Sequence, residues 1–195
     1  MIKSACMTAA LVMLLTACND RETANLDEDV AAAPADAPAT AGGSEVQGSA
    51  QRALATLQTT QGEVAGSATA TASEAGVTIS LNVEGLPPVP HGAHVHLAGR
   101  CDAPTFESAG GHWNPTDAQH GLEGPPGQHA GDMPNLTVNA EGRGSLEYRL
   151  QGASFEGLLD ADGSAMMIHA DADDQRTDPS GASGGRIACG VFRAG

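Results

Sequence analysis

Apolar and polar positions alternate along residues 76–83, the sequence Gly76-Val-Thr-Ile-Ser-Leu-Asn-Val83. Val77, Ile79 and Leu81 share one side of an extended chain, because successive side chains of a strand point to opposite faces. The pattern predicts a strand with one buried face. The same test, applied to shorter or less regular patterns as well, predicts strands over residues 52–57, 63–71, 91–97, 135–138, 144–150, 158–160, 165–169 and 187–192.

Two long segments between these strands have no such period. Residues 101–132 contain Gly, Pro, Asn and Asp throughout, and residues 170–185 are acidic and then glycine-rich. Loops of this length inside a compact domain usually carry function. Short strands, two long loops and no amphipathic helix together predict an all-β fold, an antiparallel sandwich or barrel.

The first part of the chain has a different composition. Lys3 precedes an apolar run over residues 9–15, and Leu15-Thr-Ala-Cys18 resembles the bacterial lipobox, whose cysteine becomes the lipidated first residue. We expect a lipoprotein signal peptide over 1–17; a cleaved signal with an incidental cysteine is the alternative. Residues 18–50 then form the lipidated Cys18 and a flexible acidic Ala/Pro linker, because they contain too few large apolar residues to fold. Residues 51–195 remain as the folded domain.

A signal of this kind predicts export. We expect the protein in the periplasm or cell envelope, in contact with the membrane only through the lipid on Cys18. Asn19, directly after the cysteine, resembles the pattern of lipoproteins sent to the outer membrane.

Cysteine usage agrees with export. Cys6 and Cys18 belong to the signal, which leaves Cys101 and Cys189 as one pair in the domain. An oxidising compartment makes a disulfide the natural prediction for such a pair. The bridge would tie the end of the chain to the start of the first long loop.

The charge of the chain excludes one class of partner. The formal net charge is −15, and Lys3 is the only lysine. Nucleic-acid binding depends on clustered basic side chains that neutralise phosphates, and nothing basic is clustered here. We therefore expect no nucleic-acid partner.

Histidines gather in one stretch: of the seven in the chain, all but His169 lie between residues 91 and 132. His94 and His96 lie two apart in a predicted strand, so both imidazoles project from the same face. His112, His120 and His129 follow on the long loop, with Asp132 close behind. Three imidazoles and a carboxylate suit a closed zinc site, and an all-nitrogen site with an open position suits copper. Because these ligands exceed the needs of one ion, we expect two metals.

Five motifs in this region resemble the copper/zinc superoxide dismutases. They are Gly92-Ala-His94-Val-His96, Ser108-Ala-Gly-Gly-His112-Trp-Asn-Pro115, His120-Gly, His129-Ala-Gly-Asp132-Met-Pro and Gly184-Gly-Arg186-Ile-Ala-Cys189-Gly. The resemblance covers about residues 52–195. It implies an eight-stranded antiparallel Greek-key barrel or sandwich with two long functional loops, with a copper ion and a zinc ion as cofactors.

The resemblance also implies a role for each site residue. Copper would be held by His94, His96, His112 and His169, and zinc by His112, His120, His129 and Asp132. Asp173 matches the carboxylate that links a copper histidine to a zinc histidine. Arg186 matches the arginine that sits beside copper and docks the anion, and Cys101 and Cys189 match the family's disulfide. His91, the remaining histidine, is expected to make structural hydrogen bonds.

The implied activity is conversion of superoxide to oxygen and hydrogen peroxide by redox cycling at copper, with structural zinc and with His112 and Arg186 as catalytic residues. A protein of another class is the alternative: a non-catalytic, exported copper/zinc-binding protein that stores or buffers the metals. Arg186 distinguishes the two, because storage has no use for an anion dock.

Two departures from the family pattern matter. The family often places lysines near the substrate channel, and this domain has none, so attraction of the anion would depend on the metals, Arg186 and Arg176. Ala93 stands where the family usually has a large aromatic residue, and Trp113 is a candidate for compensating packing. The resemblance leaves a monomer and a homodimer both open.

Overall fold

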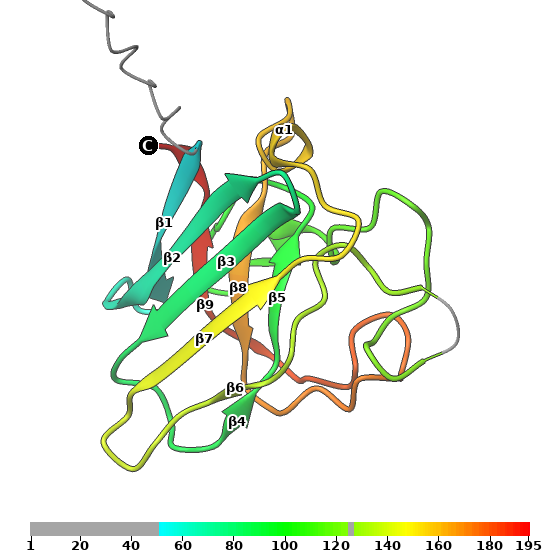
Figure 1. The fold of residues 1–195 in the computed structure, drawn as a ribbon. Coiled ribbons are helices and arrows are strands. Elements are labelled where there is room, and N and C mark those ends of the chain that lie inside the picture. The colour runs from blue at the N-terminus through cyan, green and yellow to red at the C-terminus, as the bar shows by residue number, and fades with distance from the viewer. Residues whose placement is uncertain (1–50, 125–126) are drawn as a thin grey trace, which may run out of the picture. The chain divides into compact units, whose positions relative to one another are not determined.

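The computed structural model describes residues 51–124 and 127–195 (Figure 1). The predicted signal peptide, Cys18 and the linker lie outside these residues. No helix in this part of the chain is long and apolar enough to span a membrane. The strands are β1 (Arg52–Thr59), β2 (Val64–Ser73), β3 (Gly76–Val83), β4 (Pro90–His91), β5 (Ala93–His96), β6 (Leu136–Thr137), β7 (Gly144–Arg149), β8 (Ala165–His169), β9 (Arg186–Val191) and β10 (Arg193–Ala194).

One antiparallel sheet of eight strands dominates the domain. Its order is β5-β8-β9-β1-β2-β3-β7, with β10 paired to β1, and β4 and β6 form a separate two-stranded pair. The sheet curls, so that β3 and β7 pass in front of β8 and β5 (Figure 1). The predicted all-β, antiparallel fold is confirmed.

The core follows the alternation seen in the sequence. Val77, Ile79 and Leu81 of β3 are buried, and β1 buries Ala53, Ala55 and Leu57 in the same way. These side chains fill the inside of the curled sheet, and the polar faces of β1 and β3 point away from it.

The strand predicted over 91–97 is shorter than expected. It is divided into β4 and β5 at Gly92, and Leu97 lies outside it with 45% of its surface exposed. All four residues of β5 are buried, His94 and His96 included. The prediction of one apolar face was wrong at Leu97, and the predicted polar face of β5 is an interior surface.

The strand predicted over 158–160 was wrong. Phe155–Leu158 form instead a single helical turn, α1. Ser154 begins it as the N-cap, since its hydroxyl accepts a hydrogen bond from the backbone N–H of Gly157 at 3.0 Å. Leu158, at its end, is buried in the main core.

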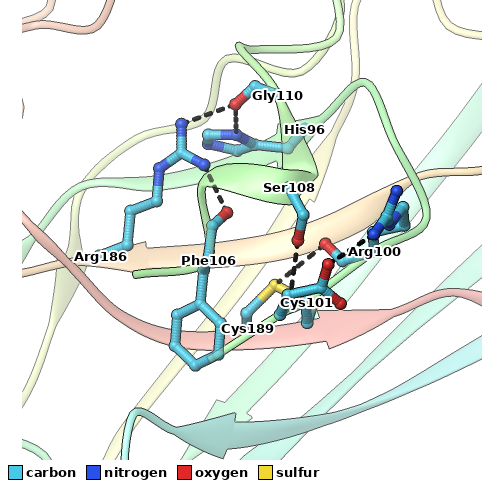
Figure 2. Close-up of a disulfide and its surroundings, with 9 residues drawn as sticks. His96, Arg100, Cys101, Phe106, Ser108, Gly110, Arg186 and Cys189 are labelled. Atoms are coloured by element: carbon cyan, nitrogen blue, oxygen red, sulfur yellow. Dashed lines mark hydrogen bonds and ion pairs between the residues drawn. A yellow bond between two sulfur atoms is a disulfide. The ribbon is translucent and has the colours of Figure 1, made fainter. Parts of the chain in front are cut away.

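The predicted disulfide is present between Cys101 and Cys189 (Figure 2). Cys189 lies in β9 and packs in a second, smaller apolar cluster with Phe106, Ala109 and Met167. The bridge therefore fastens the first long loop to the sheet near the predicted site.

Candidate metal centre

The first long loop forms the site by adding its backbone to β5. Val95 accepts a hydrogen bond from Trp113 N–H at 2.8 Å and donates one to the Gly131 carbonyl at 2.9 Å. Bridges of the same kind pair His96 with His112 and His94 with Asp132. Two distant parts of the loop are thus held against one four-residue strand.

Four histidines form the first cluster: His94, His96, His112 and His169. Each offers one ring nitrogen, and all four nitrogens lie within 4.8 Å of one another. These nitrogens (Nδ1 of His94, Nε2 of the other three) are buried and lack any hydrogen-bond partner among the described residues. Leaving buried polar atoms unpaired costs free energy, and a metal ion would satisfy all four at once.

Burial also favours the uncharged form of three members of this cluster. It lowers the pKa of His112 to about 4 and the pKa of His169 to about 3, and neighbouring histidines add to the effect. The pKa of His96 is likewise well below its usual value, chiefly through burial. Neutral imidazoles are the form that coordinates metal, and an all-nitrogen donor set fits copper.

The second cluster contains His112, His120, His129 and Asp132. Oδ1 of Asp132 lies 2.9 Å from Nδ1 of His112, 3.0 Å from Nδ1 of His120 and 3.3 Å from Nδ1 of His129. Its other oxygen accepts hydrogen bonds from the backbone N–H groups of Gly121 and His129, which fixes the carboxylate. Three nitrogens and one oxygen fit tetrahedral zinc.

His112 belongs to both clusters. Its Nδ1 faces Asp132 and its Nε2 is one of the unpaired nitrogens of the first cluster. The His112 and His94 rings lie with centroids 4.0 Å apart, tilted by 31° to each other. One imidazole thus presents a nitrogen to each predicted metal.

Asp173 is a second residue, after His112, that connects the two clusters. Its Oδ2 lies 2.6 Å from Nε2 of His94, and its Oδ1 lies 3.1 Å from Nε2 of His120. Burial opposes a charge on His120, but Asp132 and Asp173 outweigh it and raise the pKa of His120 to about 9. Gly181 makes room for this carboxylate: its φ is +64°, and a methyl group there would overlap Asp173.

Sequence reasoning missed Asn135, which holds Asp173 in place. The Asn135 amide donates to the Asp173 carbonyl and accepts from the Asp173 N–H, both at 2.8 Å. The sequence indicated only that Asn135 begins a strand. Its position three residues after Asp132 was the one available signal.

Arg186 lies beside the first cluster. Its guanidinium donates to the carbonyls of Phe106 and Gly110, both at 2.6 Å, and the Gly110 carbonyl also lies 2.9 Å from Nδ1 of His96 (Figure 2). Arg186 lines a cavity of about 440 Å³ together with His96, His112 and His169. The Arg186 guanidinium is thus a fixed positive charge in the cavity that three histidines of the first cluster also line.

Other predicted residues fall outside the two clusters. The ring nitrogens of His91 lie 2.8 Å and 2.9 Å from the carbonyls of His169 and Pro87, in agreement with a structural role. Arg176 does not line the cavity and is paired with Glu123 at 2.7 Å. Ala93 and Trp113 are buried in the same core cluster.

Comparison with known proteins identifies the class to which this fold and site belong. A model described as copper/zinc superoxide dismutase matches residues 61–192. The chain belongs to the copper/zinc superoxide dismutase family, whose cofactors are the two metals that the clusters fit.

Several bacterial proteins are similar to this chain. The copper/zinc superoxide dismutase 2 of Aquifex aeolicus is 43% identical over 148 residues, 73% of this chain and 86% of that protein. The enzyme of Caulobacter vibrioides is 39% identical over 148 residues, covering 72% and 85%. Among solved structures, a superoxide dismutase-like protein of Bacillus subtilis has 39% identity and a TM-score of 0.65, covering 71% of this chain and 96% of that one. The Brucella abortus copper/zinc superoxide dismutase has 28% identity and a TM-score of 0.61, covering 73% and 99%.

Proposed function

We propose that this protein is a superoxide dismutase, which converts two superoxide anions and two protons to one oxygen and one hydrogen peroxide. One observation carries the proposal. Four unpaired histidine nitrogens converge beside a cavity that Arg186 lines, and one of these histidines is shared with a second, mixed nitrogen and oxygen cluster.

The donor sets support one assignment of the two metals. His94, His96, His112 and His169 hold copper, and His112, His120, His129 and Asp132 hold zinc. When bound, copper supplies one-electron transfer in both directions, whereas zinc has no redox role.

Three residues of the chain then have roles in the reaction. Arg186 attracts the anion, and because two carbonyls already hold its guanidinium, the side chain need not reorganise when the anion arrives. His112 takes up a proton at Nε2 and passes it to the reduced product, while its Nδ1 stays fixed in the second cluster. Asp173 orients His94 and His120 through their outer nitrogens.

The test is superoxide decay by the purified protein loaded with copper and zinc, with His94→Ala as the control. Fast decay that the control abolishes would support the proposal. Binding of both metals without decay above the free-solution rate would favour the storage alternative.

We also propose that the chain is an exported lipoprotein anchored through Cys18. The support is the lipobox-like Leu15–Cys18 after an apolar run. Cys18→Ser should move the protein from the membrane fraction to the soluble fraction of the cell envelope. An unchanged membrane fraction would contradict the anchor.

A further inference from the structure

The cavity beside Arg186 carries more negative than positive side chains. Asp117 and Asp178 line it together with Arg186, and no other arginine or lysine is among its described lining residues. Asp117 is exposed, and the Asp178 side chain is 57% exposed. Both carboxylates therefore face the water through which an anion must approach.

Nearby arginines do not offset these carboxylates. Arg176 is paired with Glu123 at 2.7 Å, and Arg100 is paired with Asp102 at 2.6 Å. Exposed pairs of this kind present little net charge to a distant anion. The formal net charge of the whole chain, these residues included, is −15. Attraction is thus limited to the immediate surroundings of Arg186 and the metals.

We propose that Asp117 and Asp178 form a repulsive entrance to the site, so that capture of superoxide becomes faster, not slower, as ionic strength rises. The inference rests on the proposed function. When an enzyme attracts its substrate electrostatically, salt screens the attraction and the association rate falls. Here salt screens a repulsive outer field, while the attraction of Arg186 acts at short range, where screening is weak.

The expected size follows from Coulomb's law. A unit charge about 10 Å from the path of a monovalent anion changes the local anion concentration by about twofold in water at low salt. Removal of one entrance carboxylate should therefore raise the second-order rate constant about twofold, and removal of both should raise it about fourfold.

Asp117→Asn is a suitable variant. Residue 117 has a φ of +53°, a left-handed conformation that Asn tolerates as well as Asp does, so the change removes charge with little strain. Glu74→Gln is the matched control, because it removes one exposed carboxylate from the turn between β2 and β3, outside the cavity. Asp117→Asn/Asp178→Asn completes the series. The amide introduced at position 178 keeps an oxygen for the hydrogen bond that the His120 backbone N–H now donates to Asp178 at 2.7 Å.

Two readouts on the copper- and zinc-loaded protein test the entrance. The first is superoxide decay against ionic strength, which should accelerate with salt in the parent protein and less so in the double variant. The second is equilibrium binding of azide, a monovalent anion, followed by copper absorbance. Asp117→Asn should tighten azide binding about twofold, and Glu74→Gln should leave it unchanged.

The outcomes separate this inference from the proposed function. Absence of superoxide decay would remove the proposed function, and azide affinity would still test the entrance. Fast decay that slows with salt would overturn the inference while leaving the enzyme intact. Equal effects of Asp117→Asn and Glu74→Gln, or azide affinity unchanged by Asp117→Asn, would also overturn it.

Discussion

Loss of the Cys101–Cys189 bridge should both lower stability and loosen the proposed anion site at Arg186. The two cysteines are 88 residues apart in sequence, for which the chain-entropy model gives about 4.6 kcal/mol of stabilisation at 25 °C. For a domain of this size, each kcal/mol corresponds to about 2–4 °C in the unfolding midpoint, so the full effect is about 9–18 °C. Native-state strain makes this an upper value.

The functional part of this prediction follows from Figure 2. Phe106 and Gly110, whose carbonyls hold Arg186, lie in the loop that begins at Cys101, and Cys189 is three residues after Arg186. Without the bridge, loop and strand are no longer joined covalently beside the guanidinium. Arg186 should then become more mobile, and the rate of superoxide decay should fall at unchanged copper content.

The assay is thermal unfolding of the metal-free Cys101→Ser/Cys189→Ser protein beside the oxidised parent, followed by decay kinetics after metal loading. The reduced parent is the control for the substitutions themselves. A midpoint within about 2 °C of the oxidised parent would refute the reasoning, since it corresponds to less than about 1 kcal/mol.

Three further predictions concern the site. Arg186→Ala should lower the second-order rate about tenfold without changing metal content; an unchanged rate constant would remove its role as anion dock. Asn135→Leu frees the backbone of Asp173 and should weaken zinc binding about 10- to 100-fold in chelator competition, whereas parental affinity would show that Asp173 needs no such support. Zinc uptake at about pH 8 should release about one proton. His120 is protonated below its pKa of about 9 and binds metal only when neutral, so it must lose that proton. His112, with a pKa of about 4, is already neutral at this pH and releases none. The proton release should vanish well above the pKa of His120. Calorimetry of zinc binding in buffers of different protonation enthalpy measures the number of protons released. Binding heats that do not depend on the buffer would contradict the prediction.

Local patterns in the sequence were sufficient for much of the fold. The alternation of Val77, Ile79 and Leu81 predicted β3 because one buried face is a local property of a strand. The spacing of His94 and His96 predicted a shared face, and both do contribute to the first cluster. The strand expected over 158–160 failed because the Ser154 cap outweighed a short apolar run.

Contacts between residues far apart in sequence could not be predicted from local patterns. The two hydrogen bonds between Asn135 and the backbone of Asp173 join residues 38 apart in sequence. No spacing rule predicts a contact between a side-chain amide at the start of a strand and a residue in an acidic loop. Leu97 donates its backbone N–H to the Gly111 carbonyl at 3.0 Å, a contact with the long loop that the alternation does not indicate. Residue types and spacing alone grouped His112, His120, His129 and Asp132 as a zinc set. The copper set, with His112 shared between the metals, came from the family resemblance.

The sharing of His112 and Asp173 has a consequence for how the protein fills its two sites. Each ion would fix an imidazole or a carboxylate contact that the other ion also uses, so neither binding event is independent. Whatever factor zinc contributes to copper affinity, copper must return to zinc affinity, because coupling between equilibria is reciprocal. Where this coupling is favourable, a shortage of either metal weakens the protein's hold on both.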